Sequence, residues 1–259
     1  MVDSFEKIFK DITQSINPNK AWEEWLDYMI DINLFTTRNQ NLDFTTRNQN
    51  LDFNGREKQY FELFKAWVQI MYDEVRKETT NNGVTGWSDY LGTFYEENVK
   101  TSYHASARGQ FFTPPHICDV MAEMTMFEKD YKDEFLMDSC CGSGRFILAG
   151  HNKEPKIIGY GIDLDPTACK MAVMNLWVHG CRGTIINGNS LSNEFIQGWK
   201  VNQYLGIGLP APHIEIINGF EEAHQFLGRQ PKRSIEYCKA EEETVKKEIQ
   251  SNLDKFVEV

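Results

Sequence analysis

Residues 138–146 read Asp138-Ser139-Cys140-Cys141-Gly142-Ser143-Gly144-Arg145-Phe146, and no other stretch is as informative about how this chain folds. A short apolar run, 135–137, precedes the acid, and a helix-like segment follows the glycines. A second apolar run, 157–162, ends in Asp163. A glycine turn between a strand and a helix lets a ligand approach the backbone, and a carboxylate after the next strand suits ribose hydroxyls. The pattern therefore predicts the first half of a nucleotide-binding α/β unit.

Apolar residues at three- and four-residue steps predict helices around this unit. They indicate helices over 4–35, with a break at Asn17-Pro18-Asn19, and over 58–78, 87–99 and 115–126. Beyond the glycine turn we expect a helix from Gly144, a strand ending at Asp163, and a third strand at 184–186. Asp165 and Pro166 predict the start of the next helix, because aspartate caps helix N-termini and proline suits the first turn.

An identical nine-residue unit occurs twice in tandem, over 35–43 and 44–52. Two copies are too few for a solenoid, and the unit is polar. We therefore expect a solvent-exposed loop that arose by duplication. The alternative is a contact loop whose spacing is varied by the repeat.

The segment 234–259 predicts a charged helix, since Glu242 and Lys246 form an i,i+4 pair in the favourable order. This helix is expected to pack on the domain, and the alternative is a helix between subunits of an oligomer. The expected divisions of the chain are an N-terminal helical region over 1–108, a cofactor-binding domain over 109–230 and the C-terminal helix over 231–259.

The net charge of −11 restricts what the 259-residue chain does by itself. Proteins that grip DNA unaided need a basic surface, since neutralising phosphates supplies much of their affinity. DNA contact is therefore expected through a sharply localised basic patch or together with another subunit.

The six cysteines include no C-x-x-C pair, so we expect no zinc site, no disulfide framework and a reducing cytoplasm. No apolar run approaches the ~20 residues that span a bilayer, and no secretory signal is visible.

Five motifs follow one another in order along the chain. They are Asp89-Tyr90-Leu91-Gly92-Thr93-Phe94-Tyr95-Glu96, Gly109-Gln110-Phe111-Phe112-Thr113-Pro114, Asp138-x-x-Cys141-Gly142-Ser143-Gly144, Asn175-Leu176 and Gly188-Asn189-Ser190-Leu191. Together they resemble the adenine-specific DNA methyltransferases of the type I restriction-modification M-subunit kind. The resemblance implies an α/β fold with a Rossmann-like, S-adenosylmethionine-dependent sheet and an N-terminal helical domain. Because 68 residues follow Leu191, the sheet is expected to be shorter than a complete seven-stranded one.

The resemblance also implies which side chains contact S-adenosylmethionine. Asp138 would receive the ammonium of the cofactor, and Asp163 would accept both ribose hydroxyls, a bidentate role suited to a carboxylate. Asn189 would face the adenine amino group. Gln110 and Leu164 belong to the same expected cofactor-binding set.

The methionine end of the cofactor is expected to meet backbone. At Cys140, Gly142 and Gly144 the main chain would approach the methionine moiety, where a side chain at a glycine position would clash. Phe112 and Thr113 resemble the motif that holds the methionine carboxylate.

The chain departs from the family after the fourth strand, where members present Asn-Pro-Pro-aromatic. In that loop the Asn and a proline carbonyl accept hydrogen bonds from the amine of a flipped-out adenine, and the aromatic ring stacks on the base. The tetrapeptide is missing here, and the one Pro-Pro is Pro114-Pro115. The nearest echo is the strand-like run 213–217 followed by Asn218-Gly219-Phe220. Asn218 as acceptor and Phe220 as stacking platform are the candidate catalytic pair, and the alternative is a strand followed by a turn into a helix.

Two functions therefore stand side by side. The first is an S-adenosylmethionine-binding DNA adenine-N6 methyltransferase that contacts DNA together with a partner or specificity subunit. The second is a catalytically inactive cofactor-binding paralogue that acts as a structural or regulatory partner. A small-molecule methyltransferase is disfavoured by the motif at 109–114, which resembles that of the DNA enzymes.

Overall fold

The structure, a computed structural model, describes residues 4–34, 36–38, 41–43, 52–82, 86–99, 111–126, 135–206 and 211–217. The predicted C-terminal helix at 234–259 lies outside the described residues. Among the described helices, none is long and apolar enough to cross a membrane.

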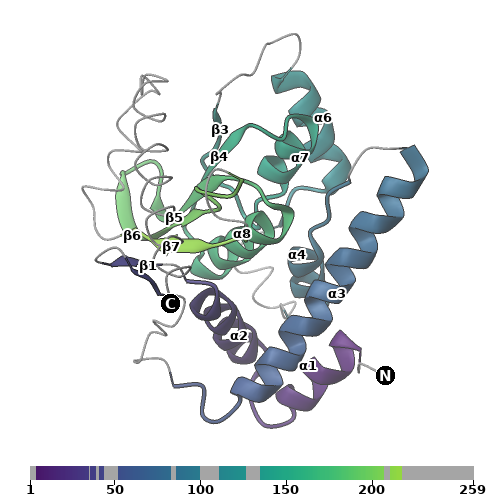
Figure 1. The fold of residues 1–259 in the computed structure, drawn as a ribbon, viewed down its shortest axis with the longest axis vertical. Coiled ribbons are helices and arrows are strands. Elements are labelled where there is room, and N and C mark those ends of the chain that lie inside the picture. Colours follow the sequence, from purple (N-terminus) through teal and green to yellow (C-terminus); the bar gives the residue numbers. More distant parts are fainter. Residues whose placement is uncertain are drawn as a thin grey trace, which may run out of the picture.

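A five-stranded mixed sheet forms the α/β part of the molecule (Figure 1). Its strands, in spatial order, are β3 (Phe135–Asp138), β4 (Ile158–Asp163), β5 (Gly183–Asn189), β6 (Glu194–Val201) and β7 (Ile214–Ile216). β3, β4 and β5 are parallel, whereas β6 and β7 run antiparallel to their neighbours. Helix α7 (Arg145–Lys153) connects β3 to β4, and α8 (Pro166–His179) connects β4 to β5. The two βαβ units predicted from the sequence are confirmed, while β6 was not predicted.

Helices build most of the rest of the described molecule. They are α1 (Phe5–Thr13), α2 (Pro18–Ile32), α3 (Glu57–Asn82), α4 (Tyr90–Phe94), the π-helical turn η1 (Tyr95–Val99) and α6 (Pro115–Thr125). The predicted break between the first two helices is confirmed, because the Asn17 side chain accepts from the amides of Asn19 and Lys20 at the start of α2. The predicted cap of α8 is confirmed as well, since Asp165 accepts from the amide of Thr167 at 2.9 Å.

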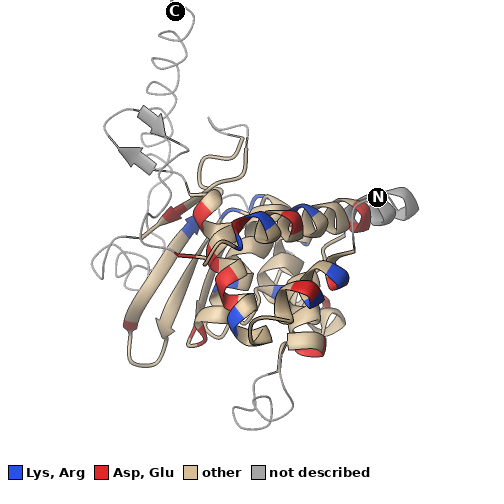
Figure 2. Ribbon diagram, turned by 90° about the horizontal axis from the view of Figure 1, so that it is seen from below, with Lys and Arg blue, Asp and Glu red and all other residues tan. Residues whose placement is uncertain are grey.

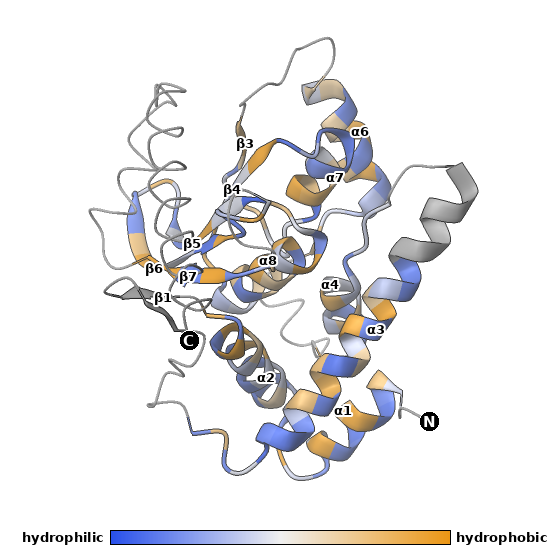
Figure 3. Cartoon of the chain, viewed as in Figure 1, coloured by the Kyte–Doolittle hydropathy of each residue, from blue (hydrophilic) through white to orange (hydrophobic). Residues whose placement is uncertain are grey.

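Helix α8 lies between the sheet and the N-terminal helices (Figure 1), most of its residues are buried, and its hydrophobic residues are not confined to one face (Figure 3). Trp177 near its end stacks on Trp67 of α3, with 6.4 Å between ring centroids. One continuous cluster of buried apolar side chains extends from Phe5 in α1 to Ile214 in β7. The N-terminal helices and the sheet therefore share a core.

The first copy of the tandem repeat contains a short hairpin. Strands β1 (Thr36–Arg38) and β2 (Asn41–Asp43) pair antiparallel, where the sequence predicted a loop. Just before it, Leu34 forms a parallel bridge with Ile214. The second copy lies almost entirely outside the described residues.

Candidate functional site

The carboxyl ends of β3, β4 and β5 bring three predicted site residues to one edge of the sheet. Asp138 ends β3, Asp163 ends β4 and Asn189 ends β5. In the parallel register Asp138 is opposite Gly161, and Asp163 is opposite Asn187. Ligands of open α/β sheets bind outside this edge. The side chains that the sequence singled out therefore lie where such a ligand would lie.

The glycine turn after β3 is held by the carboxylate that ends β4. The amide of Gly142 donates to Asp163 Oδ2 at 2.8 Å, and the amide of Asp165 donates to Asp163 Oδ1 at 2.9 Å. Each carboxylate oxygen can accept two hydrogen bonds. Asp163, which is partly exposed, thus uses one lone pair of each oxygen on a backbone amide, fixes the turn through Oδ2, and leaves capacity for ligand hydroxyls. Asp138 similarly accepts from the amide of Cys140 at 3.0 Å.

Phe112 lies against the same turn. A Cβ atom added to Gly142 would be 2.9 Å from Phe112 Cδ1, and φ of Gly142 is +53°. Both facts require glycine here, since real Cβ atoms do not approach ring carbons so closely. The amide of Phe112 donates to Glu96 Oε1 at 2.9 Å, and the carbonyl of Thr113 accepts from Arg145 Nη1 at 3.2 Å.

Gly144 serves a different contact from Gly142. Its φ is +89°, and a Cβ atom there would be 3.3 Å from Ala172 Cβ and 3.4 Å from Leu176 Cδ1. The missing side chain of Gly144 therefore faces α8, and this glycine lets α7 start close to α8.

The ends of β4 and β5 are braced by an asparagine that the sequence analysis missed. Asn187 Nδ2 donates to the carbonyls of Asp163 and Leu164, both at 3.0 Å. Leu164, a predicted cofactor residue, keeps 65% of its surface exposed beside Asp163. Asn189 Oδ1 accepts from the amides of Leu191 and Ser192, at 3.0 and 3.3 Å. The carbonyl oxygen expected to face an adenine amine thus also caps its own turn. An asparagine inside an otherwise buried apolar strand was the available signal for Asn187.

Burial and charge act differently on the acids and thiols of this turn. Burial raises the pKa of Asp138, and the nearby charge of Asp163 raises it further. The contact with Cys169, together with burial, raises the pKa of the Cys141 thiol well above its usual range. Cys140 is exposed, whereas the other four cysteines of the described segments are buried. Cys140 is therefore the described thiol that a reagent in solution can reach.

Behind the turn lies a buried polar cluster for which the sequence analysis assigned no role. Asp89 Oδ1 accepts from the amide of Gly92 and from Asn175 Nδ2, both at 2.7 Å. Asp89 Oδ2 accepts from Ser143 Oγ at 2.5 Å and from Arg145 Nε at 2.6 Å. Four donors satisfy the four lone-pair sites of this carboxylate. Asp89 and Asn175 were quoted as motif residues, but the 86-residue separation of the pair hides their contact.

Three predicted site residues are not placed by the structure. Gln110, Asn218 and Phe220 lie outside the described residues. The strand predicted before Asn218 is confirmed as β7, and the roles of these three residues stay predictions.

Comparisons with known proteins agree with the motif order. Residues 87–204 match the family model described as N-6 DNA Methylase. Part of the chain is 29% identical to the type II restriction enzyme and methyltransferase RM.BcgI of Heyndrickxia coagulans, covering 45% of this chain and 21% of the relative. Part of the chain is also 27% identical to the type I restriction enzyme MpnII methylase subunit of Mycoplasma pneumoniae, covering 57% of this chain and 27% of the relative. The HindI methylase subunit of Haemophilus influenzae is 28% identical over 49% of this chain and 30% of its own.

These matches agree with the resemblance to N-6 adenine DNA methyltransferases that the sequence predicted. The chain spans less than a third of the length of each of these relatives. No solved structure matches it.

Proposed function

We propose that the chain binds S-adenosylmethionine in a Rossmann-like manner across the carboxyl ends of β3, β4 and β5. The observation that carries this proposal is the Gly142 turn, which is tied to Asp163 of the next strand and packed against Phe112. When bound, this cofactor supplies an activated methyl group. The match of residues 87–204 to the N-6 DNA Methylase family model supports the choice of ligand.

The side chains at the strand ends match the chemistry of this ligand. Asp163 has acceptor capacity for two ribose hydroxyls, and Leu164 offers exposed apolar surface beside it for a purine ring. Asp138, half-buried at the end of β3, is placed for the ammonium. Helix α7 begins directly after the turn, and a helix N-terminus favours a carboxylate. The ammonium, carboxylate, ribose and purine of S-adenosylmethionine would each have a matching partner among these groups.

Thiol footprinting tests this assignment directly, because Cys140 is exposed in the turn. We expect S-adenosylhomocysteine to slow alkylation of Cys140 in a Cys238→Ser background, since the ligand would cover the turn. The same concentration should protect less in an Asp163→Ala variant. Equal alkylation rates with and without saturating ligand would refute binding at this site.

We further propose that the reaction served is methyl transfer to the N6 amine of adenine in DNA, within a restriction-modification system. The relatives named as methyltransferases and methylase subunits support this choice. In the view of Figure 2, Lys and Arg alternate with Asp and Glu over the described helices without forming a basic stripe. We therefore expect this chain alone to bind duplex DNA only non-specifically, with Kd of roughly 10⁻⁴–10⁻⁶ M at physiological salt, and a partner subunit to supply specificity. Sequence-selective nanomolar binding in a fluorescence anisotropy titration would contradict this.

A second candidate function is cofactor binding without turnover, favoured by the missing Asn-Pro-Pro-aromatic tetrapeptide. Without such a loop, the sequence offers only the candidate pair Asn218 and Phe220 to hold the adenine amine in line with the methyl donor. Tritium transfer from labelled S-adenosylmethionine to mixed genomic DNA separates the two candidates. No incorporation supports the silent paralogue. Incorporation that disappears in Asn218→Ala supports a working replacement loop at 218–220.

A further inference from the structure

Arg145, the first residue of α7, joins three segments that lie far apart in the sequence. Its side chain is 7% exposed. Nε donates to Asp89 Oδ2 at 2.6 Å, and Nη1 donates to the carbonyl of Thr113 at 3.2 Å. Nη2 donates to Glu96 Oε2 at 3.1 Å and to Thr93 Oγ1 at 3.4 Å. The rigid fork of the guanidinium thus fixes the 89–96 segment and the 112–113 segment relative to α7.

Glu96 extends this arrangement to the wall of the proposed site. While Oε2 accepts from Arg145, Oε1 accepts from the amide of Phe112 at 2.9 Å. The guanidinium carbon of Arg145 lies 5.3 Å from the centroid of the Phe112 ring, a distance typical of cation–π contacts. The Phe112 ring in turn packs on Gly142. A chain of direct contacts therefore runs from buried Asp89 to the glycine turn.

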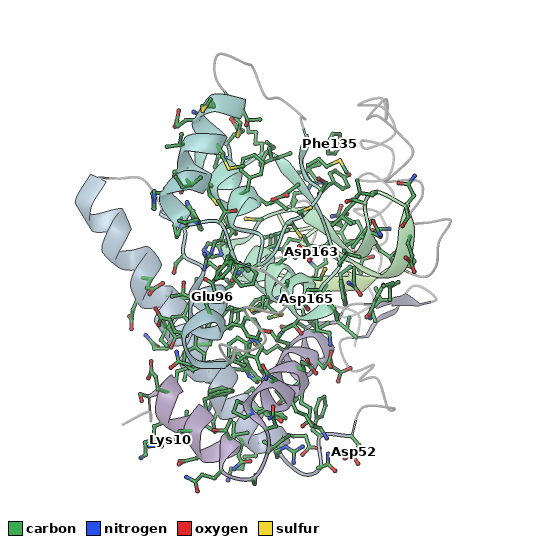
Figure 4. All side chains as sticks on the ribbon, turned by 180° about the vertical axis from the view of Figure 1, so that it is seen from behind. Lys10, Asp52, Glu96, Phe135, Asp163 and Asp165 are labelled. Carbon is green, nitrogen blue, oxygen red and sulfur yellow. The ribbon has the colours of Figure 1, made fainter. Side chains whose placement is uncertain are left out.

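The backbone around Glu96 is itself unusual. Glu96 lies in η1, a five-residue π-helical turn that continues α4. Such turns are rare in proteins, and those that occur often lie at functional sites. Figure 4 shows Glu96 beside the helices and Asp163 at the strand ends. The π-turn therefore places a carboxylate of the helical region in contact with a segment that borders the sheet.

Stability alone is a weak explanation for such a cluster. A buried ion pair often contributes no more than a well-packed apolar group, because desolvation offsets the Coulomb attraction. Defined geometry is the better-attested benefit of buried polar groups. Here the position that the cluster defines is that of the Phe112 ring over the glycine turn.

We propose that Arg145 and Glu96 are positioning residues that hold Phe112 and Thr113 over the Gly142 turn, and so shape the methionine end of the cofactor site. This inference rests on the proposed binding of S-adenosylmethionine at that turn. Glu96 acts through Phe112 and touches no ligand. Removing it should therefore weaken binding only as long as Phe112 is present.

The test uses Glu96→Ala, Phe112→Ala and the double variant, with Glu97→Ala as the matched control. Glu97 is the exposed neighbour in the same π-turn. Glu96→Ala keeps the Asp89–Arg145 pair and is expected to fold. We expect Phe112→Ala and Glu96→Ala each to weaken S-adenosylhomocysteine about tenfold in calorimetry, the effect of a 1.4 kcal/mol change. The double variant should be no weaker than Phe112→Ala, and Glu97→Ala should match the parent. Additive losses in the double variant, or unchanged affinity in Glu96→Ala, would overturn the proposal.

Amide hydrogen exchange tests the positioning without any ligand. In Glu96→Ala the Phe112 amide should exchange faster than in the parent, while the Gly142 amide, bonded to Asp163, keeps its rate. Unchanged exchange at Phe112 would refute the clamp. If the parent itself bound no S-adenosylhomocysteine, the proposed function would fail and this inference with it. Faster exchange at Phe112 would then show a clamp without a cofactor role.

Discussion

Two carboxylates on opposite sides of the glycine turn show how burial and hydrogen bonding decide what an aspartate does. Asp89, behind the turn, has a side chain that is 1% exposed and accepts hydrogen bonds from four donors of the protein. Asp163, in front of it, is partly exposed and accepts from two backbone amides. The first has no lone pair left for a ligand, and the second has. The carboxylate of Asp89 is therefore fully used by donors of the protein, whereas that of Asp163 holds the turn and still has capacity for a ligand.

The comparison predicts the largest effect for Asp89. In Asp89→Ala the Arg145 charge would stay buried without its main partner, a loss that typically costs about 3–5 kcal/mol. We expect urea denaturation to show a fall of this size in the free energy of unfolding. Asp11→Ala, which removes an exposed carboxylate bonded to Gln14, should change it by less than about 0.5 kcal/mol. A loss below about 1 kcal/mol in Asp89→Ala would remove the distinction between the two aspartates.

For Asp163 we expect the main effect on ligand affinity. Asp163→Ala would remove a charge-assisted bidentate contact, and we expect S-adenosylhomocysteine to bind about ten- to a hundredfold more weakly, or roughly 1.5–3 kcal/mol. Isothermal calorimetry measures this change, and Asp11→Ala again serves as the control. Affinity equal to that of the parent would show that the ribose lies elsewhere.

His151 in α7 extends the comparison to a partly buried side chain with one unpaired ring nitrogen. Its Nδ1 has no hydrogen-bond partner within the described segments, and burial, with a smaller contribution from His179, lowers its pKa from 6.5 to about 4. Since the folded pKa is the lower one, the unfolded chain takes up the proton first. The stability contributed by neutral His151 is complete above pH 6.5 and is lost as the pH falls toward 4, by at most about 1.4 kcal/mol per pH unit. Urea titrations at pH 7 and pH 5 should show a smaller acid loss in His151→Gln than in the parent, and equal losses would contradict the burial of this ring.

Asp165 is a third aspartate at the same edge of the sheet, and we expect the smallest effect there. Its side chain caps α8 through the amide of Thr167. Asp165→Ala should lower the free energy of unfolding by about 1 kcal/mol, the usual cost of losing an N-cap. It should weaken S-adenosylhomocysteine less than Asp163→Ala does. An equal loss of affinity would mean that the cofactor contacts both acids.

Local signals were sufficient for much of the fold. The apolar runs before Asp138 and Asp163, the glycines between them and the Asp165-Pro166 cap each depend on a few neighbouring residues, and β3, α7, β4 and α8 formed where they predicted. Strand β6 escaped prediction because its pattern is mixed, and pairing with β5 decides its conformation. The turn before it contains Asn193 with φ of +55°, and the Ser192-Asn193 pair was a signal that could have marked this hairpin.

The amino-acid sequence was sufficient to predict the resemblance to N-6 DNA methylases, the strand–turn–helix at 135–153 and the aspartates that end β3 and β4, because those features are encoded within short stretches. The contacts of the buried polar cluster behind the glycine turn were determined by the tertiary structure. Asp89 and Arg145 are 56 residues apart, and Asn175 is 86 residues from Asp89. Their contacts depend on packing α4 and α8 against α7, and no local pattern encodes that packing. Which aspartate stays available for a ligand follows from the donors that folding brings to each carboxylate.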